Sequence, residues 1–98
     1  MAHKFLVHHV GDHVGVAVED IEAGEVVEGV VLEDDSRVSV RSNASIPLGH
    51  KIALVPVAKG EKVIEYRLPI GIAVEDIAAG DYVHTHNLRT ARWSSWNN

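Results

Sequence analysis

Two stretches of this chain are near copies of each other, and this repeat restricts the possible fold more than any other feature. Residues 15–25 read GVAVEDIEAGE and residues 71–81 read GIAVEDIAAGD, so eight of the eleven positions are identical. A weaker third copy at residues 53–61 keeps only the ending of the repeat, which is an apolar residue, any two residues, a glycine and then an acid. The copies end at Gly24, Gly60 and Gly80, which are 36 and then 20 residues apart. This uneven spacing argues against a solenoid.

Each copy predicts a strand, a single helical turn and a second strand. The segment before Asp20 or Asp76 is apolar and β-branched, which favours a strand. We expect each aspartate to cap the start of one helical turn. The glycine then ends that turn, because a residue without a Cβ adopts a left-handed backbone most easily. The strands expected after the three turns are Glu25–Leu32, Lys62–Tyr66 and Tyr82–His86.

The rest of the chain also favours short strands. A first strand, Lys4–Val10, is broken by the glycine and aspartate that follow it. Residues 33–36 form the turn of the best hairpin candidate, between Val26–Leu32 and Arg37–Arg41. Residues 45–49 are expected to form a loop or a one-turn helix, and no window of twelve residues shows sustained helical periodicity. The prediction is a mostly β protein with short one-turn helices.

The length of 98 residues allows one domain, which we place at residues 1–92. A polar tail follows at residues 93–98 and contains Trp93 and Trp96. The tail is either disordered or a docking segment, since chain ends are often disordered and Trp is enriched where proteins meet.

Charge and composition exclude several classes of function. The formal net charge is −5 and there is no basic run, so nucleic acid and anionic membranes are poor candidates as partners. The chain has no cysteine, which excludes disulfides and thiolate metal ligands and fits a cytoplasmic protein. No segment has the apolar length of a signal peptide or of a membrane span.

A pair of histidines near the end of the chain is the first candidate for chemistry. His84 and His86 stand in the segment His-Thr-His-Asn at the end of an expected strand. Residues two apart on a strand share a face, so the two imidazoles could bind a metal or a polar substrate. Asn87 and Arg89 add amide and guanidinium donors directly afterwards. The alternative is that both histidines face solvent and have no role.

A second candidate is His50 with Lys51, at the end of the Pro-Leu-Gly loop. Such a loop can present both side chains to a ligand, and Lys51 could either bind a carboxylate or act as a base if desolvated. The alternative is a lysine that protects a strand edge from pairing with other sheets. His8 and His9 are adjacent on an expected strand and must point to opposite faces, so at most one of them joins a shared site.

Known local motifs do not extend this set. The chain contains no nucleophile elbow, phosphate loop or His-Glu-x-x-His pattern. A chain of this length is also poorly suited to build a closed active site unaided. We therefore expect a small domain that lends polar residues to a larger partner subunit.

Four segments resemble the N-terminal domain of altronate and galactarate dehydratases, a SAF domain. They are residues 49–54 (GHKIAL), 69–71 (PIG), 76–81 (DIAAGD) and 83–88 (VHTHNL). The resemblance runs from about Phe5 to Arg92 and implies a β-clip fold, as in antifreeze proteins and the C-terminal domain of sialic-acid synthases. In those dehydratases the domain is fused to a much larger catalytic region, whereas this chain stops after it.

A chain that stops there is most similar to the small (alpha) subunits of two-subunit sulfolactate sulfo-lyases. The features that suggest this are the N-terminal run HKFLVHH and the ending THNLRTARW. The resemblance implies a carbon–sulfur lyase that eliminates sulfite from (2R)-3-sulfolactate to give pyruvate, together with a large beta subunit. It also implies iron, Fe²⁺, shared with or held by that subunit, and inactivity of the small subunit alone.

Joined to this chemistry, the candidate residues take provisional roles. His84 and His86 are expected to hold the metal, with His86, Lys51 and His50 in catalysis. Arg89, Asn87 and His9 are expected to bind the anionic 2-hydroxy acid, because hydrogen bonds to anions are strongest from charged donors. Two alternatives stay open. The chain could be the small subunit of a split sugar-acid dehydratase, or a non-catalytic module that binds a sugar acid.

Overall fold

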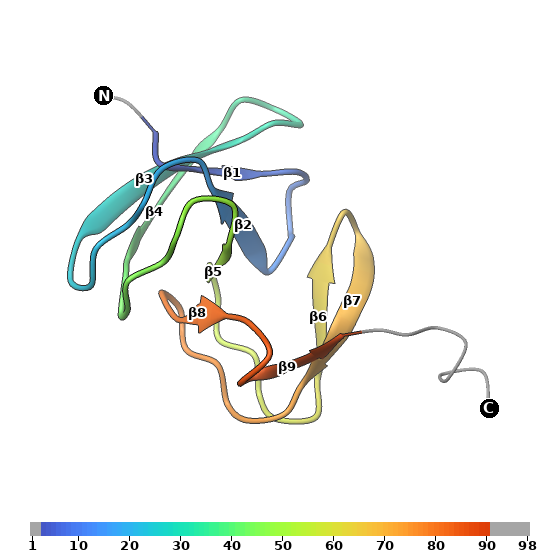
Figure 1. Cartoon of the computed structure of the whole chain (residues 1–98). Helices are drawn as coiled ribbons and strands as arrows, with labels where there is room; N and C mark the ends of the chain where they lie inside the picture. The colour runs from blue at the N-terminus through green and yellow to red at the C-terminus, as the bar shows by residue number, and fades with distance from the viewer. Residues whose placement is uncertain (1–2, 91–98) are drawn as a thin grey trace.

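The computed structural model describes residues 3–90, and every regular element in that range is a β-strand (Figure 1). The expected mostly β class is therefore confirmed. Several strands are shorter than expected, since the first ends at Val7 and the last expected one at Val83. The strands are β1 (Phe5–Val7), β2 (Val14–Ala17), β3 (Val26–Val31), β4 (Arg37–Arg41), β5 (Lys51–Ala53), β6 (Lys62–Glu65), β7 (Leu68–Ala73), β8 (Tyr82–Val83) and β9 (Leu88–Thr90).

The strands form two curved sheets. The first has six strands in the order β4-β3-β1-β2-β5-β8, and the second has three in the order β6-β7-β9. Strands β1 and β3 are parallel, and all other neighbours are antiparallel. In Figure 1 the yellow-to-red strands β6, β7 and β9 lie beside the sheet that holds β1 to β5 and β8.

Each region has its own apolar core, built mainly from β-branched side chains. The first core is formed by Phe5, Val7, Ala17, Ile21, Val27, Val31, Ile46 and Ile52. The second is formed by Val14, Ala53, Val57, Val63, Ala73, Ile77, Val83 and Leu88. Both cores draw on β2 and β5, because successive residues of a strand point to opposite faces. Strand β5 therefore presents Ile52 to the first core and Ala53 to the second.

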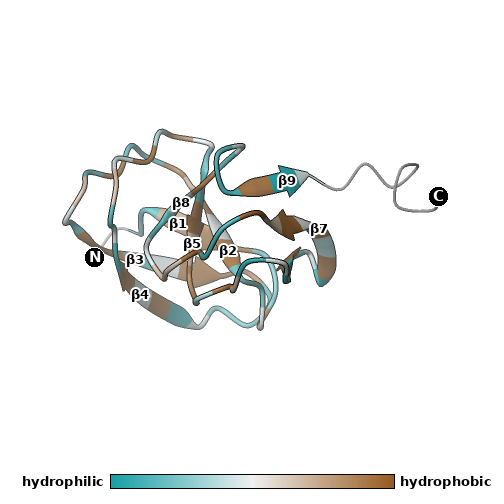
Figure 2. Ribbon diagram, turned by 90° about the horizontal axis from the view of Figure 1, so that it is seen from below, coloured by the Kyte–Doolittle hydropathy of each residue, from teal (hydrophilic) through white to brown (hydrophobic). Residues whose placement is uncertain are grey.

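The predicted hairpin at residues 33–36 is confirmed. Strands β3 and β4 pair antiparallel from Val26 opposite Arg41 to Val30 opposite Arg37. Strand β4 alternates exposed polar residues with two partly buried valines, and Figure 2 shows this alternation along it. An edge strand with charged residues at both ends resists pairing with other sheets.

The repeat forms tight turns, so the expected one-turn helices are wrong for residues 3–90. In each turn the acid after the glycine donates its backbone N–H to the residue three positions earlier, at 2.9–3.1 Å. Its carboxylate accepts the N–H of that same residue, and the three pairs are Glu22–Glu25 (3.1 Å), Ala58–Glu61 (3.0 Å) and Ala78–Asp81 (2.8 Å). The glycines have φ between 86° and 92°. A positive φ at the third position of the turn gives a type II turn, and it prevents the chain from continuing as a right-handed helix.

Asp20 and Asp76 do not cap helices either; each aspartate joins two turns. Asp20 Oδ1 accepts the N–H of Leu48 at 2.8 Å, and Asp76 Oδ1 accepts the N–H of Lys59 at 2.9 Å. The apolar residues at the start of the turns pair in the same way, Ile21 with Ile46 and Val57 with Ile77. The repeat therefore builds two pairs of facing turns.

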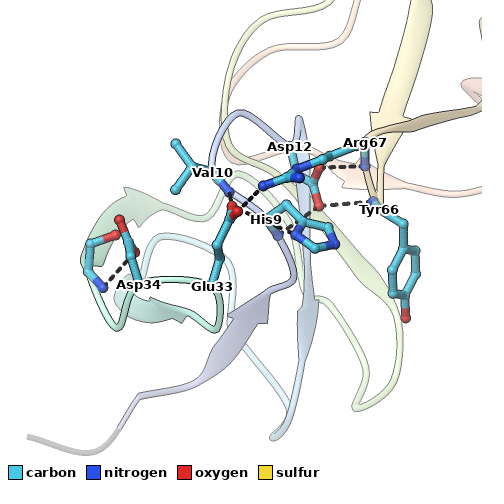
Figure 3. A network of polar contacts seen from close by, with 8 residues as sticks. His9, Val10, Asp12, Glu33, Asp34, Tyr66 and Arg67 are labelled. Carbon is cyan, nitrogen blue, oxygen red and sulfur yellow. Dashed lines mark hydrogen bonds and ion pairs between the residues drawn. The ribbon is translucent and has the colours of Figure 1, made fainter.

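A buried aspartate holds the β6–β7 hairpin in place (Figure 3). This hairpin turns at Tyr66 and Arg67, which have φ of 57° and 61°. The Asp12 carboxylate accepts the backbone N–H groups of both residues, at 3.0 and 3.1 Å, and that of His9 at 3.2 Å. Arg67 in turn forms an ion pair with Glu33, whose other carboxylate oxygen accepts the N–H of Val10.

Candidate functional site

A fourth copy of the turn stands at residues 46–50, where a loop or one-turn helix was expected. Gly49 has φ 87°, and the His50 N–H donates to the Pro47 carbonyl at 3.0 Å, as in the other copies. The copy differs at two positions, because proline replaces the residue whose N–H the acid accepts and histidine replaces the acid itself. Proline has no N–H. A carboxylate at position 50 would therefore have nothing to accept, and this position is free for another side chain.

His50 lies in a cluster of four rings, which we call the histidine cluster: His50, Tyr82, His84 and His86. The Tyr82 hydroxyl and His50 Nδ1 share a hydrogen bond of 2.6 Å. The His50 ring lies 5.2 Å from the His84 ring, and Tyr82 lies 5.4 Å from His84 and 5.8 Å from His86, between ring centroids. Because Tyr82 occupies Nδ1 of His50, the nitrogen left for a ligand is Nε2.

The local chain explains why these rings gather. Strand β8 pairs with β5, so Tyr82 stands opposite Ile52 and close to His50. Residues 84–87 form a turn rather than the end of a strand, which corrects the expected geometry of His84 and His86. Asn87 holds this turn, since its buried side chain accepts the His84 N–H at 2.9 Å and donates to the Tyr82 carbonyl at 2.8 Å. His84 and His86 are exposed at its surface.

Lys51 does not join the histidine cluster. Lys51 is the first residue of β5 and follows His50 in the chain, but it points to the opposite face of the sheet, where its Nζ lies 3.8 Å from Glu65 Oε1. Glu65 Oε2 also lies 3.6 Å from His8 Nε2. Burial is the main cause that raises the pKa of Glu65 above its ordinary value of 4.5, while the charges of Lys51 and His8 lower it.

His9 and Arg89 lie elsewhere. His9 Nδ1 is 3.7 Å from Glu33 Oε1, and the ring lies beside a groove of about 640 Å³ lined mainly by Val and Leu side chains. Arg89 is exposed on β9, opposite Ile72 of β7. The structure thus brings together His50, His84 and His86 of the predicted set and places Lys51, His9 and Arg89 apart from them. Trp93 and Trp96 lie outside the described residues.

The sequence analysis did not identify roles for Asp12, Glu65 and Tyr82, although the sequence contains a signal for the first two. Gly11 and Asp12 repeat the Gly-acid ending of the turns. Glu65 shares its strand face with Val63, so alternation alone places an acid on a buried face. For Tyr82 there was no such signal, because its contact with His50 spans 32 residues.

The metal expectation can be compared with the donors that the chain provides. Among residues 3–90, no group of three or more His, Cys, Asp or Glu side chains could hold a metal ion. His84 and His86 provide two imidazoles at most, and iron sites of this type need further ligands. Residues 3–90 alone therefore do not provide the ligands of an iron site. In the same range, no helix is long and apolar enough to cross a membrane.

Comparisons with known proteins confirm the resemblance noted in the sequence. The model of the altronate/galactarate dehydratase SAF domain matches residues 3–91. The (2R)-sulfolactate sulfo-lyase subunit alpha of Chromohalobacter salexigens is 42% identical over 95% of this chain and 100% of its own length. The subunit of the same name from Paracoccus pantotrophus is 45% identical over 65% of this chain and 96% of its own length.

A longer relative gives the same result for the domain. Altronate dehydratase of Escherichia coli is 44% identical over 89% of this chain, but the match covers only 16% of that enzyme. The two relatives that the match covers almost entirely are therefore named as subunits, whereas the longer relative contains the domain as one part. The chain belongs to the altronate/galactarate dehydratase SAF domain family.

Proposed function

We propose that this chain is the small subunit of a two-subunit, cytoplasmic lyase that eliminates sulfite from (2R)-3-sulfolactate. The single observation that carries the proposal is the 42% identity to a sulfolactate sulfo-lyase subunit alpha over the full length of that protein. The small subunit would be inactive alone, because His84 and His86 are exposed and no complete metal site exists in residues 3–90.

The reaction sets the tasks that the site must perform. The proton on C2 of sulfolactate leaves to a base, the C3–S bond breaks with its electron pair on sulfite, and the resulting enol becomes pyruvate. The products together contain all atoms of the substrate, and no external oxidant or reductant is needed. Such an elimination needs a base, stabilisation of the enediolate and help for the leaving group.

The histidine cluster suits these tasks. His50 is oriented by Tyr82 through Nδ1, so its Nε2 would exchange a proton with the substrate or the leaving group. His84 and His86 would hold iron together with ligands from the large subunit. When bound, the iron would supply Lewis-acid polarisation of the 2-hydroxy carboxylate. Asn87 would support the site indirectly, by holding the turn that carries His84 and His86. Arg89 and His9 lie apart from the histidine cluster, so they would bind substrate only if the large subunit places it next to them.

The test is turnover by the chain assembled with its large subunit. Sulfolactate should yield equal amounts of sulfite and pyruvate, and neither subunit alone should do so. Replacing His86 by Ala should abolish turnover while the subunits still copurify. His3→Ala is the matched control, since His3 lies outside the cluster, and should keep full activity. Full activity of His86→Ala would refute the assignment of this residue.

The match to altronate dehydratase favours one second candidate, the small subunit of a split sugar-acid dehydratase. The two candidates differ in the leaving group, which is water in place of sulfite. Offering altronate and galactarate to the same assembled protein separates them. If the assembled protein forms a 2-keto sugar acid from altronate or galactarate and releases no sulfite from sulfolactate, the dehydratase is favoured.

A further inference from the structure

The β6–β7 hairpin closes with a turn that its own sequence disfavours. Only Tyr66 and Arg67 join the two strands, and Glu65 stands opposite Leu68. Both turn residues have positive φ, 57° and 61°. A two-residue turn of this kind usually contains Asn and Gly, because larger side chains are strained in the left-handed region. Tyr and Arg therefore occupy positions that local backbone energetics would assign to other residues.

The buried carboxylate of Asp12 explains how the turn persists. Asp12 is 5% exposed and accepts the backbone N–H groups of Tyr66 and Arg67. These hydrogen bonds reach the backbone only, so they would hold other residues at the two positions equally well. They do not explain why the side chains are Tyr and Arg. Strained positions that the surrounding structure maintains occur preferentially at functional sites.

The turn is part of an exposed surface that we call the hairpin patch. Its members are 52–64% exposed and are Val10, Tyr66, Arg67 and Leu68. His8 stacks on the Tyr66 ring with centroids 3.9 Å apart, which fixes the direction of that ring. Glu33 connects Arg67 to the N–H of Val10 (Figure 3). Tyr and Arg are enriched among the residues that dominate the energy of protein–protein contacts.

The hairpin patch continues into the groove of about 640 Å³. Val10 belongs to both, and the other apolar side chains that line the groove are Val7, Val31, Val38, Val40, Leu54 and Val55. Single exposed apolar residues are ordinary, whereas a continuous apolar surface indicates an interaction site. Leu54 of the groove and Tyr82 of the histidine cluster pack against the same apolar core. A large partner that covers the groove could therefore also reach the histidine cluster.

The charge beside the groove indicates the kind of partner. Residues 33–35 are Glu-Asp-Asp and all three are exposed, and Asp34 borders the groove. The chain as a whole carries a formal net charge of −5. Two copies of this chain that met through this surface would bring acidic loops toward each other, which is unfavourable. A different protein that places basic residues beside an apolar segment would complement both the loop and the groove.

We propose that the hairpin patch and the adjoining groove form the docking surface for the large subunit. The complementary surface of that subunit is apolar and carries basic residues that face the acidic loop. The identity of the partner rests on the proposed function. In this arrangement Tyr66 and Arg67 are retained for binding at the expense of an easier turn.

The first experiment separates binding from folding. The double variant Tyr66→Asn with Arg67→Gly has the residues that the turn prefers, and it keeps the backbone donors to Asp12. Its unfolding temperature should therefore equal or exceed that of the wild-type chain. Its affinity for the purified large subunit, measured by biolayer interferometry, should fall at least ~30-fold, as for loss of an energetically dominant contact.

Two further variants support this measurement. Leu68→Thr leaves the turn unchanged and suits an exposed strand position, and it should weaken binding by roughly 5- to 10-fold. Val26→Thr is the matched control, because Val26 is 70% exposed but lies outside both the hairpin and the groove lining. It should bind with wild-type affinity. Equal losses for Leu68→Thr and Val26→Thr would overturn the proposal.

The second experiment tests the charge of the partner. Asp35→Asn removes one charge from the acidic loop, and Asn tolerates the positive φ of 61° at this position. The association rate with the large subunit should fall about two- to fivefold at low salt. At about 1 M salt, where charges are screened beyond about 3 Å, variant and wild type should associate equally fast. A faster association of the variant at low salt would contradict a basic partner surface.

The outcomes separate this proposal from the proposed function. If the turn variant and Leu68→Thr bind as tightly as the wild-type chain, the docking surface is wrong and the proposed function stands. If the assembled wild-type protein releases no sulfite but both variants bind weakly, the proposed function fails and the docking surface stands. Sedimentation of the chain alone is the third measurement. A wild-type dimer that the turn variant converts to a monomer would show that a second copy occupies the surface, which overturns the proposal.

Discussion

Three turns of the repeat end in an acid that accepts the N–H of its own turn, whereas the turn at residues 47–50 ends in a histidine that contacts another strand. The backbone is the same in both, with a glycine at positive φ and one hydrogen bond from the fourth residue to the first. The difference begins at Pro47, which removes the N–H that a carboxylate would accept. Because this turn forms without a side-chain hydrogen bond, its last side chain is available for chemistry.

The largest effect is expected from making the fourth turn resemble the others. His50→Asp should lower sulfite release by the assembled protein at least ~100-fold, as for loss of a positioned acid–base group. The chain should also lose about 1 kcal/mol of stability, since the hydrogen bond to Tyr82 is lost and the new carboxylate has no N–H of its own turn to accept. Turnover assays and urea unfolding measure the two quantities. Near wild-type turnover would mean that His50 does no chemistry.

The glycines of two turns provide a matched pair. A Cβ at Gly80 would lie 2.0 Å from the Arg41 carbonyl oxygen, whereas a Cβ at Gly49 would meet no atom within 4 Å. Gly49→Ala should cost about 1 kcal/mol from the left-handed backbone alone. Gly80→Ala should cost about 3 kcal/mol or more, because the carbonyl must also move. Equal costs in urea unfolding would show that the turn at 78–81 does not pack against Arg41 as described.

The closing acids should also differ among themselves. Asp81 accepts both the Ala78 N–H and the Asn43 side-chain amide, at 2.8 and 2.9 Å, whereas Glu61 closes its own turn only. Asp81→Ala should destabilise the chain by about 1.5 kcal/mol and Glu61→Ala by about 0.5–1 kcal/mol. Thermal unfolding measures both. Glu61→Ala should leave sulfite release unchanged, and a large loss there would remove the distinction between closing acids and His50.

The smallest expected effect concerns Glu65, an acid that closes no turn. Burial raises the pKa of Glu65 above its ordinary value of 4.5. The folded chain therefore binds more protons than the unfolded chain between pH 4.5 and the pKa of Glu65 in the folded state. This contribution to stability is full below pH 4.5 and is lost as pH rises through the folded pKa. Glu65→Gln should therefore flatten the decline of unfolding free energy with rising pH. Parallel curves for wild type and variant would contradict it.

The same comparison explains which features could be predicted. The glycines at 24, 60 and 80, the β3–β4 hairpin and the mostly β class follow from local backbone preferences and were predicted correctly. One-turn helices were not, because a cap, two residues and a glycine are equally compatible with a type II turn. The choice between the two depended on the partners of Asp20 and Asp76, whose contacts are 28 and 17 residues away.

The candidate site divides along the same line. The sequence indicated that His50, Lys51, His84 and His86 are available for chemistry. It did not indicate that His50, at the end of a turn, and Lys51, at the start of β5, would point to opposite faces of the sheet, or that Tyr82 would orient His50. It also left Glu65 unnoticed, although its alternation with Val63 was readable.

The sequence by itself determined the residue types and the turns, because glycine conformation, proline chemistry and β-branching act within a few neighbouring residues. Only the tertiary structure decided which side chains meet. Strand pairing joins residues that are tens of positions apart, and a step of one residue along a strand moves a side chain to the other face. For this reason two consecutive residues belong to different clusters. His50, at the end of a turn, contacts the rings of Tyr82 and His84, whereas Lys51, at the start of β5, faces the buried carboxylate of Glu65.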